Sequence, residues 1–178
     1  MLPTANHMRK TLIRHIGSLC IVYALLAPFT AVYAGSVETM HDFTSDGCSL
    51  FPNGNLEHRD LWCDCCFAHD IAYWRGGAKL DRKQADEALR DCVIERTQNR
   101  ALANVMYEGV RAGGHPAFPT WYRWAYGWNY GRGYKVLREE EQQEAESKLN
   151  AYIALHPTGY CQERSDRKPQ PKEGRDAN

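Results

Sequence analysis

Reactive side chains are concentrated in one short stretch of the chain, which reads WCDCCFAHDIAY. Thiols can form disulfides or bind zinc, and an imidazole beside a carboxylate can take part in acid–base catalysis. These chemistries compete for the same residues, so the compartment in which the protein folds helps to decide between them. The stretch contains Cys63, Cys65, Cys66, His69 and Asp70.

The N-terminal residues are typical of a secretory signal peptide. A basic group within residues 9–14 precedes an apolar run at 16–32, which Pro28 interrupts and which ends in the small-residue pattern AVYA. The run is short for a membrane span, so an uncleaved anchor is the less favoured interpretation. We therefore expect cleavage after Ala34, with residues 1–34 as the signal peptide, and a secreted or periplasmic protein.

The remaining chain is long enough for one domain. Removal of the signal peptide takes away three basic residues and no acidic one, which changes the formal net charge from 0 to −3. This balance gives no basis for nucleic-acid binding, and no second apolar run is long enough to cross a bilayer. We expect a domain at 35–163 and a tail at 164–178 that is disordered by composition.

Cysteine usage favours disulfides over a metal site. Six cysteines remain once Cys20 leaves with the signal peptide, and an even number in an exported domain is typical of a disulfide framework. Counting alone does not select the pairing. A zinc site built from the thiols and His69 is the alternative, but adjacent cysteines rarely bind one ion together and such sites usually belong to reducing compartments. That alternative would use Cys63, Cys65, Cys66 and His69.

The pattern of apolar residues predicts a mainly helical fold. Asp81 is expected to begin the second helix, with Gln84 completing a capping box. Aromatic residues in 117–134 could lie at a membrane interface, but we expect them to cover the outer face of the helical core. The expected segments are a loop at 41–58, helices at 59–75 and 81–113 on either side of a turn at 76–79, and a helix at 137–155.

The first two helices could place an imidazole beside a carboxylate. A bond between Cys65 and Cys92 would be centred on the glycine turn, as an antiparallel hairpin requires. His69 lies one turn after Cys65 on the same face, and the position opposite it is within one turn of Asp86. An imidazole can act as the general base for water, and a carboxylate on its other nitrogen fixes its tautomer.

Asp70 points elsewhere, because it lies about a hundred degrees around the helix from His69. Its simplest neighbour is the 41–58 loop. A carboxylate that faces a loop rich in backbone carbonyls is the outline of a calcium site, and a bound Ca²⁺ could polarise an ester carbonyl. A His-Asp dipeptide alone means little, and Asp86 alone could be a solvated charge. The hypothesis of a catalytic pair depends on their joint spacing with Cys65 and Cys92.

These residues resemble the secreted phospholipase A2 superfamily, whose long helix carries C-C-x-x-H-D-x-x-Y. Here the pattern runs from Cys65 to Tyr73. In that family the second helix carries an aspartate six residues before the cysteine that pairs with the first of the adjacent cysteines, and Asp86 and Cys92 have this spacing. The match covers about residues 43–93.

The resemblance implies a Ca²⁺-dependent hydrolase that cleaves the sn-2 ester of glycerophospholipids at a phospholipid membrane surface. His69 would activate water, Asp86 would orient His69, and Tyr73 would support the pair by hydrogen bonding. The implied Ca²⁺ ligands are the carboxylate of Asp70 and the backbone carbonyls of Gly47, Ser49 and Phe51.

The implied fold is mainly α, with two antiparallel disulfide-linked helices, an upstream calcium loop and an additional C-terminal helix. The loop departs from the family's glycine-rich pattern, and Pro52 restricts the residue before it. A non-catalytic secreted binding or effector module on the same scaffold is therefore the alternative function. The implied disulfides are Cys65–Cys92 and Cys48–Cys66, which leave Cys63 and Cys161 for each other.

Overall fold

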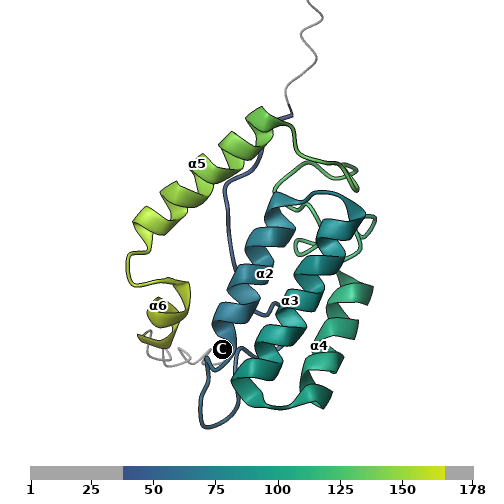
Figure 1. Cartoon of the computed structure of the whole chain (residues 1–178). Helices are drawn as coiled ribbons and strands as arrows, with labels where there is room; N and C mark the ends of the chain where they lie inside the picture. Colours follow the sequence, from purple (N-terminus) through teal and green to yellow (C-terminus); the bar gives the residue numbers. More distant parts are fainter. Residues whose placement is uncertain (1–37, 167–178) are drawn as a thin grey trace, which may run out of the picture. The chain divides into compact units, whose positions relative to one another are not determined.

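Helices dominate the part of the chain that the computed structural model describes, residues 38–166. The expected signal peptide at 1–34 and residues 167–178 of the expected tail lie outside the described residues. Residues 164–166, which we expected in the tail, belong instead to the last helix. The helices are α2 (Cys63–Arg75), α3 (Lys79–Thr97), α4 (Arg100–Gly113), α5 (Glu139–Leu155) and α6 (Tyr160–Asp166), as Figure 1 shows.

The turn between α2 and α3 depends on two glycines. Gly76 and Gly77 have φ angles of 73° and 143°, values that favour glycine over other residues. A Cβ atom on Gly76 would also lie 2.7 Å from the Cβ atom of Ala125. The tight reversal brings α2 and α3 together as an antiparallel pair (Figure 1).

The expected start of the second helix was two residues late. The helix begins at Lys79, and Asp81 occupies its first turn instead of capping it. The Asp81 carboxylate accepts a hydrogen bond from the backbone N–H of Ala78 at 2.7 Å. It thus gives a partner to the N–H of the residue that precedes the helix.

The expectation of one helix from Asp81 to Gly113 was wrong, because the segment is two helices. Gln98 adopts the left-handed conformation with φ of 55°, which ends α3. Asn99 then caps α4, and its side chain accepts a hydrogen bond from the N–H of Leu102 at 3.0 Å. The chain reverses at this point, and α4 packs beside α3.

The first helix begins later than residue 59. Residues 59–62 form turns that continue the upstream loop. Trp62 closes these turns: its backbone N–H donates to Asn53 O at 3.0 Å and its indole N–H to Pro52 O at 2.7 Å. The segment has no Gly or Pro and so suited a helix, but the N–H groups of Leu61 and Trp62 donate to loop carbonyls.

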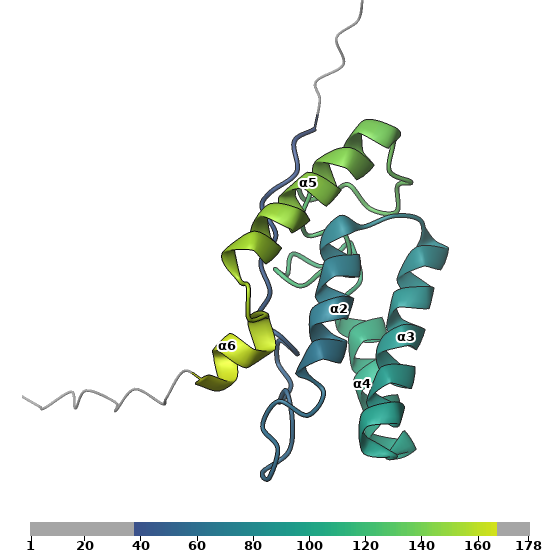
Figure 2. The same cartoon turned by 60° about the vertical axis from the view of Figure 1, so that its left-hand side comes forward.

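Two clusters of buried apolar side chains meet at α2. Trp62, Cys65 and Cys66 belong to a cluster shared with α3 and α4. Tyr73 and Trp74 belong to the other cluster, which includes side chains of α5 and of residues 117–134, here called the aromatic segment. In Figures 1 and 2, α2 lies between α3 on one side and α6 on the other.

The aromatic segment closes the C-terminal end of α2. The last carbonyls of a helix have no partner within it, and here this segment supplies donors. We expected these rings on the outer face of the core, but Trp124 and Trp128 are fully buried within it, whereas Trp121 and Tyr130 are largely exposed. The bonds run from Ala125 N to Tyr73 O (2.7 Å), from Gly127 N to Trp74 O (3.1 Å) and from Trp128 Nε1 to Arg75 O (2.8 Å).

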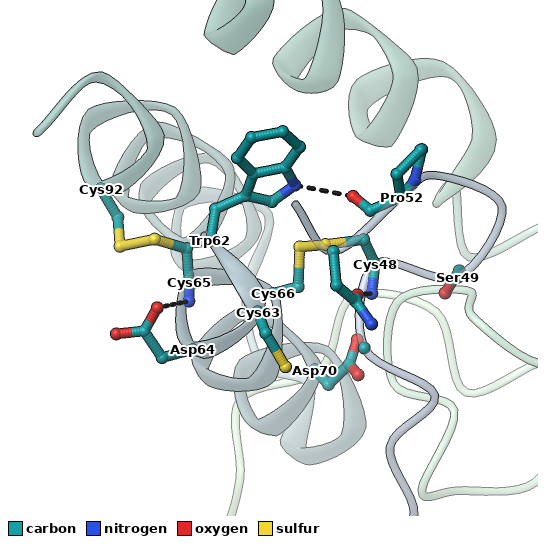
Figure 3. The surroundings of a disulfide bond; sticks show 12 residues. Cys48, Ser49, Pro52, Trp62, Cys63, Asp64, Cys65, Cys66, Asp70 and Cys92 are labelled. Atoms are coloured by element: carbon teal, nitrogen blue, oxygen red, sulfur yellow. Dashed lines mark hydrogen bonds between the residues drawn. A yellow bond between two sulfur atoms is a disulfide. The ribbon is translucent and has the colours of Figure 1, made fainter. Parts of the chain in front are cut away.

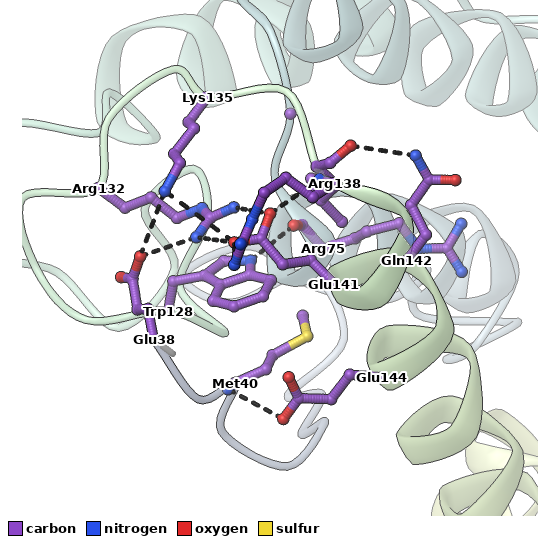
Figure 4. Close-up of polar contacts among 12 residues, drawn as sticks. Glu38, Met40, Arg75, Trp128, Arg132, Lys135, Arg138, Glu141, Gln142 and Glu144 are labelled. Atoms are coloured by element: carbon purple, nitrogen blue, oxygen red, sulfur yellow. Dashed lines mark hydrogen bonds and ion pairs between the residues drawn. The ribbon is translucent and has the colours of Figure 1, made fainter. Parts of the chain in front are cut away.

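Helix α5 is held by a buried ion pair at its N-terminal end. Glu141 accepts hydrogen bonds from Arg132 at 2.8 Å and from the backbone N–H of Arg138 at 2.9 Å (Figure 4). Arg132 also contacts Glu38, and its guanidinium lies 3.7 Å from the centre of the Trp128 ring. We expected the charged residues of this helix to form a solvated face, and Glu141 is the exception.

All six cysteines within the described residues form disulfides. The structure pairs Cys48 with Cys66, Cys63 with Cys161, and Cys65 with Cys92. These are the pairs that the resemblance implied. The zinc hypothesis is wrong because its three cysteines are committed to disulfides.

Candidate functional site

Helices α2 and α3 bring His69 and Asp86 together. The Nε2 atom of His69 lies 2.8 Å from Oδ1 of Asp86, whose side chain is fully buried. Burial alone would raise the pKa of Asp86, but hydrogen bonds from His69, Arg111 and Tyr73 hold it below its usual value. An ionised carboxylate only accepts, so Nε2 carries the ring proton of a neutral imidazole. Nδ1 is then the nitrogen that can take a proton.

Tyr73 contacts the same carboxylate. Its hydroxyl lies 2.7 Å from Oδ1 of Asp86 and accepts a hydrogen bond from Nε of Arg82 at 3.0 Å. Burial first, and then the charge of Asp86, raise the pKa of Tyr73 far above its usual value. The hydroxyl therefore stays protonated and donates a hydrogen bond to Asp86.

Two arginines complete the surroundings of Asp86, and sequence reasoning missed both. Arg111 donates to Oδ2 of Asp86 at 2.5 Å, and Nε of Arg82 lies 3.9 Å from the same oxygen. Arg82 precedes Asp86 by one helical turn, a spacing that could have identified it. No spacing pointed to Arg111, since its approach depends on the chain reversal at Gln98.

His69 faces a cavity of about 350 Å³. The wall on the α2 side carries the polar groups His69, Asp70 and Tyr73. The opposite walls are mostly apolar, which suits a long hydrocarbon group better than a polar substrate. These walls come from the 47–51 loop, α3, α4 and the aromatic segment, and include Leu50, Phe51, Leu89, Val105, Met106, Val110 and Tyr122.

The 41–58 loop is attached to α2 beside the His69 cavity. The Cys48–Cys66 disulfide joins the two segments, and Figure 3 shows Asp70 below this bond. Asn53 accepts a hydrogen bond from the Cys48 N–H at 2.7 Å. A Cβ atom at Gly47 would lie 2.5 Å from the Asn53 amide oxygen, so the loop requires glycine there.

The four expected calcium ligands lie around one space. Gly47, Ser49 and Phe51 line the cavity together with Asp70. Gly47 and Ser49 both have positive φ angles, 78° and 53°, so the backbone turns sharply on each side of Cys48. The structure thus brings together the expected loop and carboxylate, and these residues also border the cavity at His69.

Asp70 is a buried carboxyl group with an unusual environment. Burial raises its pKa to about 8, and the nearby charge of Asp46 adds to the effect. Hydrogen bonds from the Ser45 hydroxyl, at 2.6 Å, and from the Gly47 N–H work in the opposite direction. The charged form of this group therefore lacks compensation, which a cation would provide.

The side chains next to Asp70 offer oxygen atoms as possible ligands. Within the described residues, no group of three or more His, Cys, Asp or Glu side chains is placed to hold a metal ion. The Ser45 hydroxyl bonds to Asp70, the Asp46 carboxylate is close enough to act on its charge, and the loop backbone contacts it through the Gly47 N–H. Hard cations such as Ca²⁺ take this kind of oxygen set, with backbone carbonyls as regular members.

Comparisons with known proteins leave the family open. No protein-family model matches the chain, and neither the curated proteins nor the solved structures include a similar one.

None of the helices in the described part of the chain is long and apolar enough to cross a membrane.

Proposed function

We propose that this chain is an exported, Ca²⁺-dependent hydrolase of the phospholipase A2 type, which cleaves the sn-2 ester of glycerophospholipids. The observation that carries the proposal is the His69–Asp86 pair, at 2.8 Å, bordering an apolar cavity that also reaches Asp70 and its loop. The three disulfides are in keeping with export.

His69 has the geometry of a general base. With Nε2 bound to Asp86, Nδ1 can take a proton from a water molecule as the water oxygen forms a bond to the ester carbonyl carbon. Asp86 holds the tautomer and stabilises the imidazolium that forms. When the ester C–O bond breaks, the imidazolium returns its proton to the departing alcohol. The products are a fatty acid and a lysophospholipid.

Asp70 and the carbonyls of Gly47, Ser49 and Phe51 would hold the calcium ion. When bound there, Ca²⁺ would supply positive charge to the ester carbonyl and the lipid phosphate. A charge held there would lie close to His69, because Asp70 follows His69 in α2 and the loop is joined to α2 by the Cys48–Cys66 bond.

The cavity favours a lipid over a small polar ester. Its walls away from the polar groups are mostly aliphatic and aromatic, and a hydrocarbon chain placed there is removed from water. A long-chain ester would place its carbonyl at the polar end of the cavity, near His69 and Asp70.

The test is release of fatty acid from vesicles of mixed phosphatidylcholine and phosphatidylglycerol, with Ca²⁺ or with chelator. Lipids with different acyl chains at sn-1 and sn-2 identify the bond that is cleaved. We expect Ca²⁺-dependent release from sn-2, which His69→Gln abolishes while the disulfides remain. His58→Gln is the matched control, since His58 is exposed and is not among the residues that line the cavity.

Two results would count against this function. One is equal release from wild type and His69→Gln. The other is a folded, fully disulfide-bonded wild type that releases nothing with Ca²⁺ present. The second result would favour the alternative of a binding module on the same scaffold.

A further inference from the structure

Asp86 contacts a residue from a third helix. His69 comes from α2 and Asp86 from α3, while Arg111 comes from the last turn of α4. Its Nη1 atom donates to Oδ2 of Asp86 at 2.5 Å. A charge-assisted hydrogen bond of this kind is stronger and more directional than one between neutral groups.

The two carboxylate oxygens of Asp86 have separate partners. Oδ1 receives His69 and Tyr73, and Oδ2 receives Arg111. The other cation nearby, Arg82, has its Nε at 3.9 Å from Oδ2, and that Nε already donates to Tyr73. Arg111 is thus the only hydrogen-bond donor to Oδ2 among the described residues.

Loss of the Arg111 side chain would leave Oδ2 without a donor in a fully buried position. A buried acceptor without a partner is costly, so the carboxylate would turn toward Arg82. That rotation would move Oδ1 away from His69 and Tyr73. Small misplacement of a catalytic group costs a large part of the rate.

We propose that Arg111 is a positioning residue: it holds the Asp86 carboxylate in the orientation that directs His69. This inference rests on the proposed function.

Arg111 is the better choice of the two arginines for a test. Arg82 is buried, and its nitrogens also bond to Tyr134 and to the last carbonyls of α4, so its replacement would disturb the packing. The Arg111 side chain is 26% exposed. Its backbone carbonyl, which accepts from Arg82, remains after any substitution.

Three variants of the full chain test the role. Arg111→Gln removes the charge, and Arg111→Lys keeps a charged donor. Arg100→Gln is the matched control, because it makes the same charge change at an exposed position of the same helix. Vesicle assays at a fixed pH give kcat and KM, thermal unfolding gives Tm, and NMR at the same pH follows the His69 Nε2–H resonance without Ca²⁺.

We expect Arg111→Gln to lower kcat about 10- to 100-fold in assays below its Tm, with KM little changed and Tm reduced because a buried carboxylate loses a donor. Arg111→Lys should recover part of the loss, and Arg100→Gln should behave as wild type. The Nε2–H resonance should move upfield and broaden in Arg111→Gln, because the bond to Asp86 weakens, and it should return toward its wild-type position in Arg111→Lys.

An unchanged kcat together with an unchanged resonance in Arg111→Gln overturns the positioning role. So does a loss confined to KM or to Tm, or one that Arg111→Lys does not recover in part. The NMR comparison needs no turnover. A wild type without hydrolytic activity would therefore refute the proposed function, while the resonance would still decide whether Arg111 orients the pair.

Discussion

The hydroxyl of Tyr73 lies 2.7 Å from Oδ1 of Asp86, the same oxygen that His69 contacts. The Tyr73 and His69 rings also pack against each other, with their centres 4.2 Å apart. One side chain thus supports the pair both through a hydrogen bond and through ring contact, and the two contributions can be separated.

Replacing Tyr73 with Phe keeps the ring contact and removes the hydrogen bond. We expect fatty-acid release to fall about two- to tenfold, in proportion to one net hydrogen bond. The free energy of unfolding should fall by about 1–3 kcal/mol, because Nε of Arg82 loses its acceptor. Vesicle assays and urea unfolding measure the two effects. Tyr107→Phe is the control; equal effects of both substitutions would contradict the support role.

Asp70 is the carboxylate on which calcium binding depends in our proposal. Asp70→Asn removes the carboxyl group that would ionise to bind Ca²⁺, with little change in shape, so the rise in Tm that we expect Ca²⁺ to produce in wild type should disappear. The exposed Asp91→Asn, measured by the same thermal unfolding with and without Ca²⁺, should retain the rise. A full Ca²⁺ shift in Asp70→Asn would show that the ion binds elsewhere.

The ionisation of Glu141 should make the stability of the fold depend on pH. Burial alone would raise its pKa, but hydrogen bonds from Arg132 and Arg138 lower the pKa to about 2, from an ordinary 4.5. Because the pKa is lower in the folded state, this stabilisation is complete above about pH 4.5 and is lost as the pH falls toward 2.

Glu141→Gln should therefore reduce the free energy of unfolding by roughly 2 kcal/mol at pH 7, since Arg132 keeps a buried charge with less compensation. At pH 3 the free energies of unfolding of Glu141→Gln and wild type should differ by less than at pH 7, which urea unfolding at the two pH values measures. Glu140→Gln, an exposed neighbour, should have little effect at either pH. A difference that stays constant between pH 7 and pH 3 would contradict the ionised pair.

The disulfides should differ in their effect on the site. Cys65–Cys92 joins α2 to α3, one turn from His69, whereas Cys63–Cys161 attaches α6. Removing Cys63–Cys161 by paired Cys→Ser changes should lower stability by several kcal/mol, about 4–5 for a loop of this length, yet retain hydrolysis below the new Tm. Removing Cys65–Cys92 should lower both stability and kcat. Equal kcat values in the two double variants would contradict this assignment.

The sequence supplied the parts of the site that lie on one hairpin. The spacing from Cys65 to His69 and from Asp86 to Cys92 is local, and helical periodicity converts it directly into a shared face. His69 and Asp86 accordingly lie together in the structure. The same logic placed Asp70 toward the upstream loop.

Contacts that depend on tertiary geometry were beyond such reasoning. Arg111 reaches Asp86 because α3 ends at Gln98 and the chain reverses, a break hidden by apolar spacing that continues through it. Trp128 was expected on the outer face of the core, but its bond to Arg75 O depends on how the aromatic segment folds over α2. Nothing in its spacing specified that partner.

The position of Cys161 near the end of the described chain has a consequence for the order of events during synthesis. Two disulfides join residues 18 and 27 positions apart, so they can form as soon as α3 has been synthesised. Cys63 must wait for a partner 98 residues away. Until then it is a reduced thiol two residues from Cys65, able to attack the bonds already made. Oxidative folding of this chain thus carries an inherent risk of disulfide shuffling, and a disulfide isomerase should raise its yield.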